Sequence, residues 1–538
     1  MSQPESSRGL KSVAARNAIS AVLARSSTLV VGLILTPFVL NRIGAELYGV
    51  LVAAGAAYEY LSLLRGGMGA ALRRYVTLAH HSSQHEEATR HYAVGFWLAA
   101  ILRTFILLVA VLIAGAICRF VRLPEHLLRD GAAGVALILA AAVVTDAAAT
   151  QDIPIYATGR TAKLGVIQAL RGWLRLGVTL VAFSLLVPSL TVYGGGLVVT
   201  EFVPLLLLVW MGRRTGVVRS VIPRPQLGDR EIRRKLFQYG GVALLLQAAT
   251  LLYLATDNLL IGRIFGAASV THYSLGARWS PLILAFLVTS ISSIVPLFTQ
   301  LEAHGESERS REALTRIVAI TASLAIPFCL VPCVVGDIFL VQWVGSEYVQ
   351  RLGPESHGSA AYMLALLIPT TLEVALSPIS MVLLGRGRIG WIATGEIIAA
   401  LGKVGLGLVL ALPLGFGLLG FALGTTVALV VKNLVVRLLA IRGDPAFPSA
   451  WTLLLPLPRA LAGGAPALIA LYLLRGVYDG GLAQVMVAGI AGGVLCLAGS
   501  ALVAMRPRGI AELLRTLRSA WRPEKADGPP ADTGGNRF

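Results

Sequence analysis

Long apolar runs recur along the whole chain, separated by short polar, Gly-containing or Pro-containing segments. The runs are roughly 18–25 residues long, which is the length that a helix needs to cross ~30 Å of hydrocarbon. Strands of a membrane barrel would be about ten residues long with strict alternation, a pattern that the sequence does not show. Only 14% of the residues are charged, against about 25% in soluble domains. The runs therefore predict an all-α, polytopic membrane protein.

By window length, we predict about fourteen membrane-spanning helices. Six lie at 17–40, 47–70, 91–117, 133–157, 164–187 and 194–211, and six more at 237–262, 269–300, 313–337, 359–384, 389–411 and 416–440. A final pair lies at 455–475 and 481–505. The span at 133–157 has the weakest pattern because it contains Asp146 and Asp152.

The placement of Lys and Arg supports an even number of spans. With the N-terminus in the cytoplasm, roughly thirty basic residues fall in cytoplasmic segments and about seven in outer loops, as the positive-inside rule requires. An odd number of spans would scramble this bias. We therefore expect both termini in the cytoplasm. The net charge of +18 then reflects topology, and no nucleic-acid partner is expected.

The spans divide into two lobes and an appended pair. We predict a cytoplasmic tail at 1–16, an N-lobe at 17–211, a basic cytoplasmic linker at 212–236, a C-lobe at 237–440, an extra helix pair at 441–505 and a second tail, expected to be disordered, at 506–538. The basic linker is either an interfacial helix on anionic lipid, where each basic residue gains about 1 kcal/mol, or a plain topogenic connection.

A faint internal repeat supports the two lobes. The segment Arg42–Gly49 joins the first two spans, and Gly266–Tyr273 joins the seventh and eighth about 222 residues later. Six spans per unit give both units the same orientation in the membrane. The pseudo-two-fold axis should then lie along the membrane normal, as in other parallel-repeat transporters.

Ionisable residues inside spans are the functional candidates, because each costs roughly 2.5–3.5 kcal/mol even on the mildest scales. They are Arg25, Glu59, Arg65, Arg103, Asp146, Arg171, Arg175, Asp257, Arg278, Glu373, Glu396 and Lys403.

The inner half of the predicted interior is rich in cations. Arg171 and Arg175 lie one helical turn apart on one face of a span, and Arg25 and Arg65 lie at similar depth in theirs. Lys403 shares a helical face with Glu396. Arg presents a planar fork of donors that matches phosphate, so these side chains suit an anionic substrate. The alternative is that they are snorkelling or topogenic residues near span ends.

Asp257 and Arg278 form a second candidate group near the outer ends of adjacent spans. They would form an outer gate, or Asp257 would exchange H⁺ or Na⁺, or the two would be a static structural pair. Glu59 and Glu373 lie near mid-span and are weaker candidates for ion coupling. The sequence has no metal-site spacing, P-loop or nucleophile motif, so no metal, cofactor or ATP hydrolysis is predicted.

The chain resembles bacterial polysaccharide-biosynthesis exporters in the segments Leu40–Gly49 and Thr256–Gly262 and in the Arg-rich segment after the second span. These are the O-antigen and capsule flippases of the multidrug/oligosaccharidyl-lipid/polysaccharide (MOP) superfamily, which also contains the lipid II flippase. The resemblance covers most of 17–440. It implies two six-helix lobes around a central cavity, alternating access between leaflets, and an undecaprenyl-pyrophosphate-linked oligosaccharide as substrate.

This resemblance leads to a specific functional expectation. The pyrophosphate would be held by Arg25, Arg65, Arg171, Arg175 and Lys403. Asp257 and Arg278 would form a gate or couple transport to an ion. The last two spans would line a groove for the lipid tail, as an additional helix pair does in the lipid II flippase. Only Arg25 and Arg278 match the arginine pattern of that flippase, and loosely, which favours an exopolysaccharide, capsule or O-antigen (lipopolysaccharide) unit over a peptidoglycan precursor.

Further partners and rival functions stay open. Membrane lipids, a polysaccharide polymerase and export machinery are the expected partners, and H⁺, Na⁺ or the membrane potential would drive the cycle. The first rival is a cation-coupled multidrug exporter of the same superfamily, which usually has twelve spans and an acidic cavity. The second is a membrane-embedded glycan polymerase or glycosyltransferase, which would need a larger outer loop than this chain has.

Overall fold

A computed structural model describes residues 5–65, 67–159, 161–225, 228–292, 298, 307–349, 357–444, 447–477 and 481–521. Within these ranges the chain is helical and contains no strand. The helices of the first half are α1 (Glu5–Ser62), α2 (Met68–His81), α3 (His85–Phe120), α4 (Leu128–Gln151), α5 (Ile153–Ala157), α6 (Ala162–Leu185) and α7 (Leu190–Arg213). Those of the second half are α8 (Arg230–Leu254), α9 (Thr256–Phe265), α10 (Ala267–Ala277), α11 (Trp279–Ser292), α13 (Ser307–Val344), α14 (Ser346–Val349), α15 (Ser359–Gly385), α16 (Ile389–Ala411), α17 (Leu418–Val431), α18 (Arg437–Ile441), α19 (Ala450–Leu454), α20 (Pro456–Leu473) and α21 (Leu482–Trp521).

Among the described residues, eleven helical segments are long and apolar enough to cross a membrane. They coincide with twelve of the predicted spans, because the segment Leu23–Ser62 contains the first two, joined at Gly44. The other two predictions, 237–262 and 269–300, overlap α8 to α11, and the second lies partly outside the described residues. The prediction of an all-α, polytopic membrane protein is confirmed, and the count of fourteen stays a prediction.

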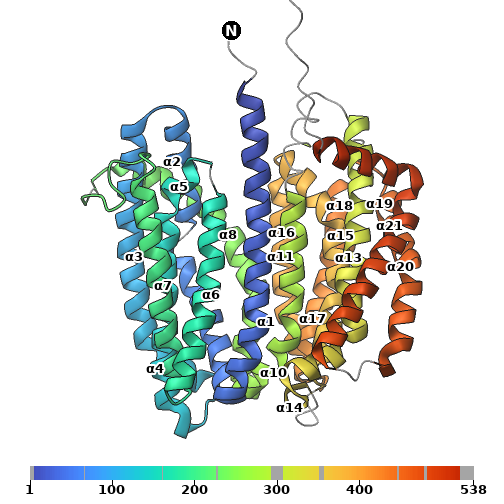
Figure 1. Cartoon of the computed structure of the whole chain (residues 1–538), viewed down its shortest axis with the longest axis horizontal. Coiled ribbons are helices and arrows are strands. Elements are labelled where there is room, and N and C mark those ends of the chain that lie inside the picture. Colours follow the sequence, from blue (N-terminus) through green and yellow to red (C-terminus); the bar gives the residue numbers. More distant parts are fainter. Residues whose placement is uncertain are drawn as a thin grey trace, which may run out of the picture.

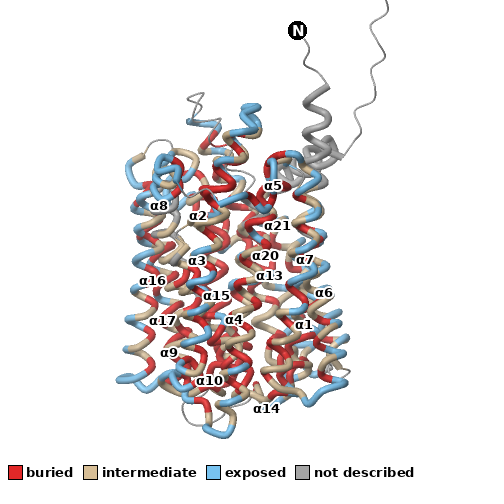
Figure 2. The backbone as a smooth tube through the Cα atoms, turned by 90° about the vertical axis from the view of Figure 1, so that its left-hand side faces the viewer, coloured by how far each residue is buried: buried red, intermediate tan, exposed pale blue. Residues whose placement is uncertain are grey.

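The bundle has two groups of helices with α1 between them (Figure 1). Helices α2 to α7 lie on one side, and α13 to α21 lie on the other. Helices α20 and α21 pack against each other and against α13. The first described helix begins, and α21 ends, at the same end of the molecule, as an even number of crossings requires. Buried residues run through the middle of the bundle, while exposed ones gather at its periphery and its ends (Figure 2).

Two glycines make equivalent turns at the end of the bundle opposite the start of α1. Gly44 has φ 82° and ψ 170°, and Gly266 has φ 91° and ψ 170°. This backbone region is open almost only to glycine, because a Cβ atom would clash with the local backbone. The two turns fall at the same position of the predicted repeat. The repeat, faint in sequence, therefore has a matching backbone conformation.

The segments after these turns pack against each other across the lobe interface. The Thr271 hydroxyl donates to the carbonyl oxygen of Ala45 at 2.6 Å. Conversely, a Cβ atom on Gly49 would lie 1.8 Å from the carbonyl oxygen of Ala267. Ala45 and Ala267 are equivalent in the repeat, as are Gly49 and Thr271. The interface is therefore reciprocal, as in a symmetric dimer.

The basic linker folds back on the N-lobe instead of forming a separate helix in its described part. Residues 214–225 are non-helical, and Val217, Val218 and Val221 are buried against α2 and α3. Trp97 of α3 donates to the carbonyl oxygen of Pro223 at 2.9 Å. The interfacial-helix interpretation is therefore wrong for this part of the linker, because residues 214–225 are non-helical and their three valines are covered by protein.

Candidate functional site

A polar cavity of about 250 Å³ lies inside the C-lobe and reaches Val52 of the N-lobe. Asp257, at the start of α9, and Lys403, in α16, both line it and are buried. Their Oδ2 and Nζ atoms are 3.0 Å apart. The Tyr273 hydroxyl donates to the same oxygen at 2.7 Å, and Lys403 also donates to the carbonyl oxygen of Tyr253. The ion pair is therefore supported by hydrogen bonds through Oδ2, while the buried Oδ1 atom of Asp257 has no hydrogen-bond partner among the described residues.

Arg278 lines the same cavity but is not the ion-pair partner of Asp257. Its Nη1 donates to the Thr36 hydroxyl of α1 at 2.7 Å, and its guanidinium carbon lies 5.8 Å from the centre of the Trp343 ring. The expected Asp257–Arg278 pair is thus replaced by two separate contacts, because Lys403 approaches Asp257 from α16. Arg278 instead ties the C-lobe to α1, with no carboxylate partner among the described residues.

Arg171 and Arg175 of α6 share one carboxylate. Arg171 Nε and Arg175 Nη2 lie 3.0 Å and 3.2 Å from the oxygens of Glu201, which is completely buried in α7. Two cations and one anion leave this cluster with one excess positive charge. Both arginines keep part of their side chain exposed, so that charge is accessible.

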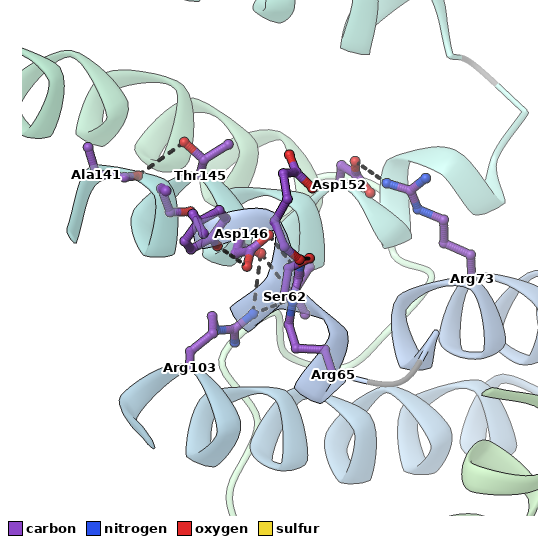
Figure 3. Close-up of polar contacts among 12 residues, drawn as sticks. Ser62, Arg65, Arg73, Arg103, Ala141, Thr145, Asp146 and Asp152 are labelled. Carbon is purple, nitrogen blue, oxygen red and sulfur yellow. Dashed lines mark hydrogen bonds and ion pairs between the residues drawn. The ribbon is translucent and has the colours of Figure 1, made fainter. Parts of the chain in front are cut away.

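A second N-lobe cluster surrounds Asp146 of α4 (Figure 3). Arg65, in the short 3-10 turn Leu63–Arg65 after α1, binds its carboxylate at 2.6 Å. Tyr58 of α1 donates to the other carboxylate oxygen. Arg103 of α3 donates to the Asp146 backbone carbonyl at 3.3 Å and to the Thr150 hydroxyl at 2.6 Å. Two arginines thus surround one acid, and the cluster joins α1, α3 and α4.

Glu373 of α15 is the centre of a third cluster. Lys432, Asn433 and Arg437 bind its carboxylate at 3.1, 2.9 and 2.6 Å, and Lys432 also pairs with Glu396 at 2.7 Å. Lys432–Val436 form a π-helical turn. In a regular α-helix, Lys432 and Arg437 would point about 140° apart, so the wider turn brings both cations to one acid.

The two remaining predicted residues lie on α1. Glu59 is exposed, at the end of α1 that carries Tyr58. Arg25 is also exposed, and its Nη1 donates to the carbonyl oxygen of Ala285 in α11 at 3.3 Å. Arg25 therefore bridges the lobes from the N-lobe side, while Arg278 bridges them from the C-lobe side.

Some of these charged groups are neutralised within their own cluster, and others keep an excess positive charge. The Asp257–Lys403 pair and the Glu373–Glu396–Lys432–Arg437 cluster are internally neutral. Arg25 and Arg278 have no carboxylate partner among the residues described, and the Arg171–Arg175 pair keeps one excess charge. The contact between the lobes is therefore positively charged.

An apolar groove of about 440 Å³ lies directly behind the polar cavity. It is lined by α13 and α21, with Phe339 and Val335 on one wall and Ile490 and Val494 on the other. Trp279 also lines the groove, while its neighbours in sequence, Arg278 and Ser280, line the polar cavity. The groove and the cavity thus lie on different sides of the chain at the junction of α10 and α11.

Sequence reasoning missed three of these charges: Glu201, Lys432 and Arg437. Glu201 is isolated in the apolar run 197–210, and the need for a counter-ion to Arg171 and Arg175 is the signal that would have revealed it. Lys432 and Arg437 both bind Glu373 only because of the π-turn, and no pattern in the sequence predicts that turn.

The arrangement of two helical lobes, a polar cavity and buried charge clusters is that of a multi-span membrane protein whose fold is shared with solved transporters. Solved structures with the same fold include the lipid II flippase MurJ in an inward closed conformation, with a TM-score of 0.65 and 11% identity over 93% of this chain and 99% of that one. They also include a multidrug resistance MATE family transporter of the MOP superfamily in an inward-facing conformation, with a TM-score of 0.67 and 13% identity over 77% and 93%.

Sequence comparison identifies the family. Residues 76–352 match the model of the polysaccharide biosynthesis protein family, and the chain belongs to that family. A curated relative is the uncharacterized membrane protein EpsK of Bacillus subtilis (strain 168), 23% identical over 416 residues that cover 74% of this chain and 77% of that protein. The resemblance inferred from the sequence is confirmed.

Proposed function

We propose that the protein is a flippase that moves an undecaprenyl-pyrophosphate-linked oligosaccharide from the cytoplasmic to the periplasmic leaflet of the bacterial inner membrane. The product would feed exopolysaccharide, capsule or O-antigen synthesis. The cycle alternates access between the leaflets, with both termini in the cytoplasm. The observation that carries this proposal is that Arg278 and Ser280 line the polar cavity while Trp279, between them in sequence, lines the apolar groove.

Each part of such a substrate has a matching surface. Arg25, Arg278 and the Arg171–Arg175 pair supply the charge and planar donors for a pyrophosphate. The groove beside α21 accepts an isoprenoid chain, because its lining is almost entirely apolar. In this proposal Arg65 and Lys403 act through Asp146 and Asp257 rather than by direct contact, since both are already ion-paired.

A cation-coupled multidrug exporter is the second candidate, supported by the similarity to MATE transporters. Such an exporter needs a carboxylate free to exchange a cation. Asp146, Glu201, Asp257 and Glu373 are each paired with Lys or Arg, which favours the anionic lipid-linked substrate. The exposed Glu59 is the acid that the second candidate would use.

The test is a leaflet-resolved flipping assay in proteoliposomes with a defined undecaprenyl-pyrophosphate-linked oligosaccharide. Arg25→Gln and Arg278→Gln should each weaken substrate binding about 10- to 100-fold, because a hydrogen bond between charged groups contributes about 1.5–3 kcal/mol. Arg119→Gln, at an exposed site on α3, is the matched control. Unchanged flipping by the two variants would exclude the proposed pyrophosphate site. Efflux of a cationic drug that depends on an ion gradient would favour the second candidate.

A further inference from the structure

The outer side of the N-lobe has a pocket of about 540 Å³ that is separate from the polar cavity of the C-lobe. It lies among α3, α4 and α7, and Ile222 of the linker forms part of its lining. Its walls are apolar, with Leu205, Leu206 and Val209 on α7. The lining also contains two arginines and one glutamine, and no carboxylate. The proposed function makes no use of this pocket.

Arg103 is the polar group at the base of the pocket. Its side chain is only 7% exposed, although it lies in a span and has no ion-pair partner among the described residues. Within that part of the chain, both of its hydrogen bonds are made by Nη1, one to the Thr150 hydroxyl and one to the backbone of Asp146, which lies beside Arg103 in Figure 3. The carboxylate of Asp146 is already bound by Arg65 and Tyr58. Arg103 thus presents a charge to the pocket that the protein does not neutralise.

Gln151 adds a second donor. It is 4% exposed, and its side-chain oxygen accepts from the Tyr92 hydroxyl at 3.1 Å. That bond orients the amide so that its NH₂ group remains a donor beside Arg103. Arg213, at the end of α7, is exposed and supplies a second cation at the rim. The polar groups of the pocket are therefore all donors where a ligand would lie.

The mouth of the pocket opens on the outer surface of the bundle. Leu206, Trp210 and Ile222 are each more than half exposed there, on a chain that spans a membrane. The rim lies at the end of α7, and Leu205 lies about 12 Å further along the helix. Trp is enriched at this level of a membrane, where its ring contacts both acyl chains and headgroups. The pocket therefore faces lipid near the headgroup level.

We infer that this pocket binds the phosphate of an anionic phospholipid, with Arg103, Gln151 and Arg213 as donors and the α7 wall against the acyl chains. A zwitterionic lipid fits less well, because the lining has no carboxylate for its ammonium group. The ligand lies in the inner leaflet, an assignment that rests on the proposed orientation of the chain. Phosphate contacts of this kind resemble those of the basic pockets between helices that bind anionic headgroups.

Native mass spectrometry of the full chain, with phosphatidylglycerol or phosphatidylcholine of the same acyl chains, tests this site. We expect the wild type to bind phosphatidylglycerol about tenfold more tightly than phosphatidylcholine, which corresponds to one charged contact. Arg103→Gln removes the charge, and Ala147→Phe fills the pocket without touching a hydrogen bond. Both should abolish the preference, while Arg90→Gln, at an exposed site in the same lobe, should keep it.

The outcomes separate the alternatives. Equal binding of both lipids by the wild type overturns the proposal, and so does an unchanged preference in Ala147→Phe. If Arg103→Gln does not fold, Ala147→Phe alone decides, because it keeps the native charges. Displacement of the lipid by an equal concentration of inorganic phosphate would show a free-anion site without a role for the apolar wall, and would also overturn the proposal.

Discussion

Buried charges in this protein are arranged in clusters whose balance differs between the two lobes. Asp257 and Lys403 neutralise each other inside the C-lobe cavity. Arg171 and Arg175 share Glu201 and keep one excess charge. Because an isolated ion in a membrane interior is costly, each unneutralised arginine needs either water or an anionic ligand. The positions of Arg25 and Arg278 between the lobes make a ligand that enters between the lobes the natural partner.

The Asp257–Lys403 pair can be measured by a double-mutant cycle. Asp257→Asn or Lys403→Met alone should destabilise the protein by about 3–5 kcal/mol, because each leaves one buried group without its partner. The double variant should lose clearly less than the sum of the two losses. Thermal unfolding in a fixed detergent measures all four proteins. Additive losses would show that the two side chains do not interact in the membrane.

Local sequence pattern predicted some of these residues and not others. Arg171 and Arg175 were predicted as a pair because their spacing is one helical turn. Their partner Glu201 lies on another helix, and nothing local connects it to them. Asp257 was predicted to pair with Arg278, its neighbour along the chain, whereas the structure pairs it with Lys403, nearly 150 positions away. Such ion-pair partners depend on how distant helices pack together, and this packing cannot be inferred from the local pattern of a single sequence.

At the scale of single elements, Gly44 and Gly266 are the positions where backbone conformation fixes the fold. Nothing lies within 4 Å of a Cβ atom added to Gly266, and only Glu46 Oε2 approaches one at Gly44, at 3.8 Å. An alanine there would meet no steric obstacle from packing. Any cost of substitution therefore reports the backbone conformation alone.

Gly44→Ala and Gly266→Ala should each destabilise the protein by about 1–3 kcal/mol, the cost of holding a residue with a Cβ atom in this region. The two losses should be similar, since the φ and ψ angles agree closely. Gly55→Ala is the control, because it lies within α1 with free space around it and should be neutral or slightly stabilising. Unequal losses in the first two variants, measured by thermal unfolding, would show that the two turns are not equivalent.

The π-turn Lys432–Val436 is an element that no periodicity in the sequence predicted. The apolar run 416–440 reads as one regular helix, and the five-residue spacing of Lys432 and Arg437 suggests different faces. Such turns are rare and often occur at functional sites. Here the turn exists together with its contacts to Glu373, which compensate for the lost helical hydrogen bonding.

For the whole molecule, the all-helical class and the family resemblance followed from the sequence, because span length and turn glycines are local properties. The folding of the linker onto α3 did not follow from the sequence, because it depends on buried contacts such as Trp97 with Pro223. The number of spans, the domain boundaries and the roles of the site residues stay predictions.

The groove beside α21 gives a prediction at this scale. Gly489 lines it, and a Cβ atom there would lie 3.9 Å from Val335, so a larger side chain fits only by occupying the groove. Gly489→Leu should reduce flipping of a long-chain substrate about tenfold, since roughly two buried CH₂ contacts account for 1.4 kcal/mol, and spare a short-chain analogue. Gly405→Leu, at an exposed site of α16, is the control. An equal loss of flipping for the long-chain and short-chain substrates would show that the groove does not bind the isoprenoid tail.

The reciprocal contact of Ala45 and Gly49 with Thr271 and Ala267 bears on how the chain arose. Two equivalent segments that meet reciprocally have the arrangement that a symmetric dimer of half-length chains would have. The two sides of the contact differ in sequence, because Gly49 allows a close backbone approach on one side and the Thr271 hydroxyl donates a hydrogen bond on the other. This is the pattern expected of a duplicated and fused gene whose two halves have since diverged.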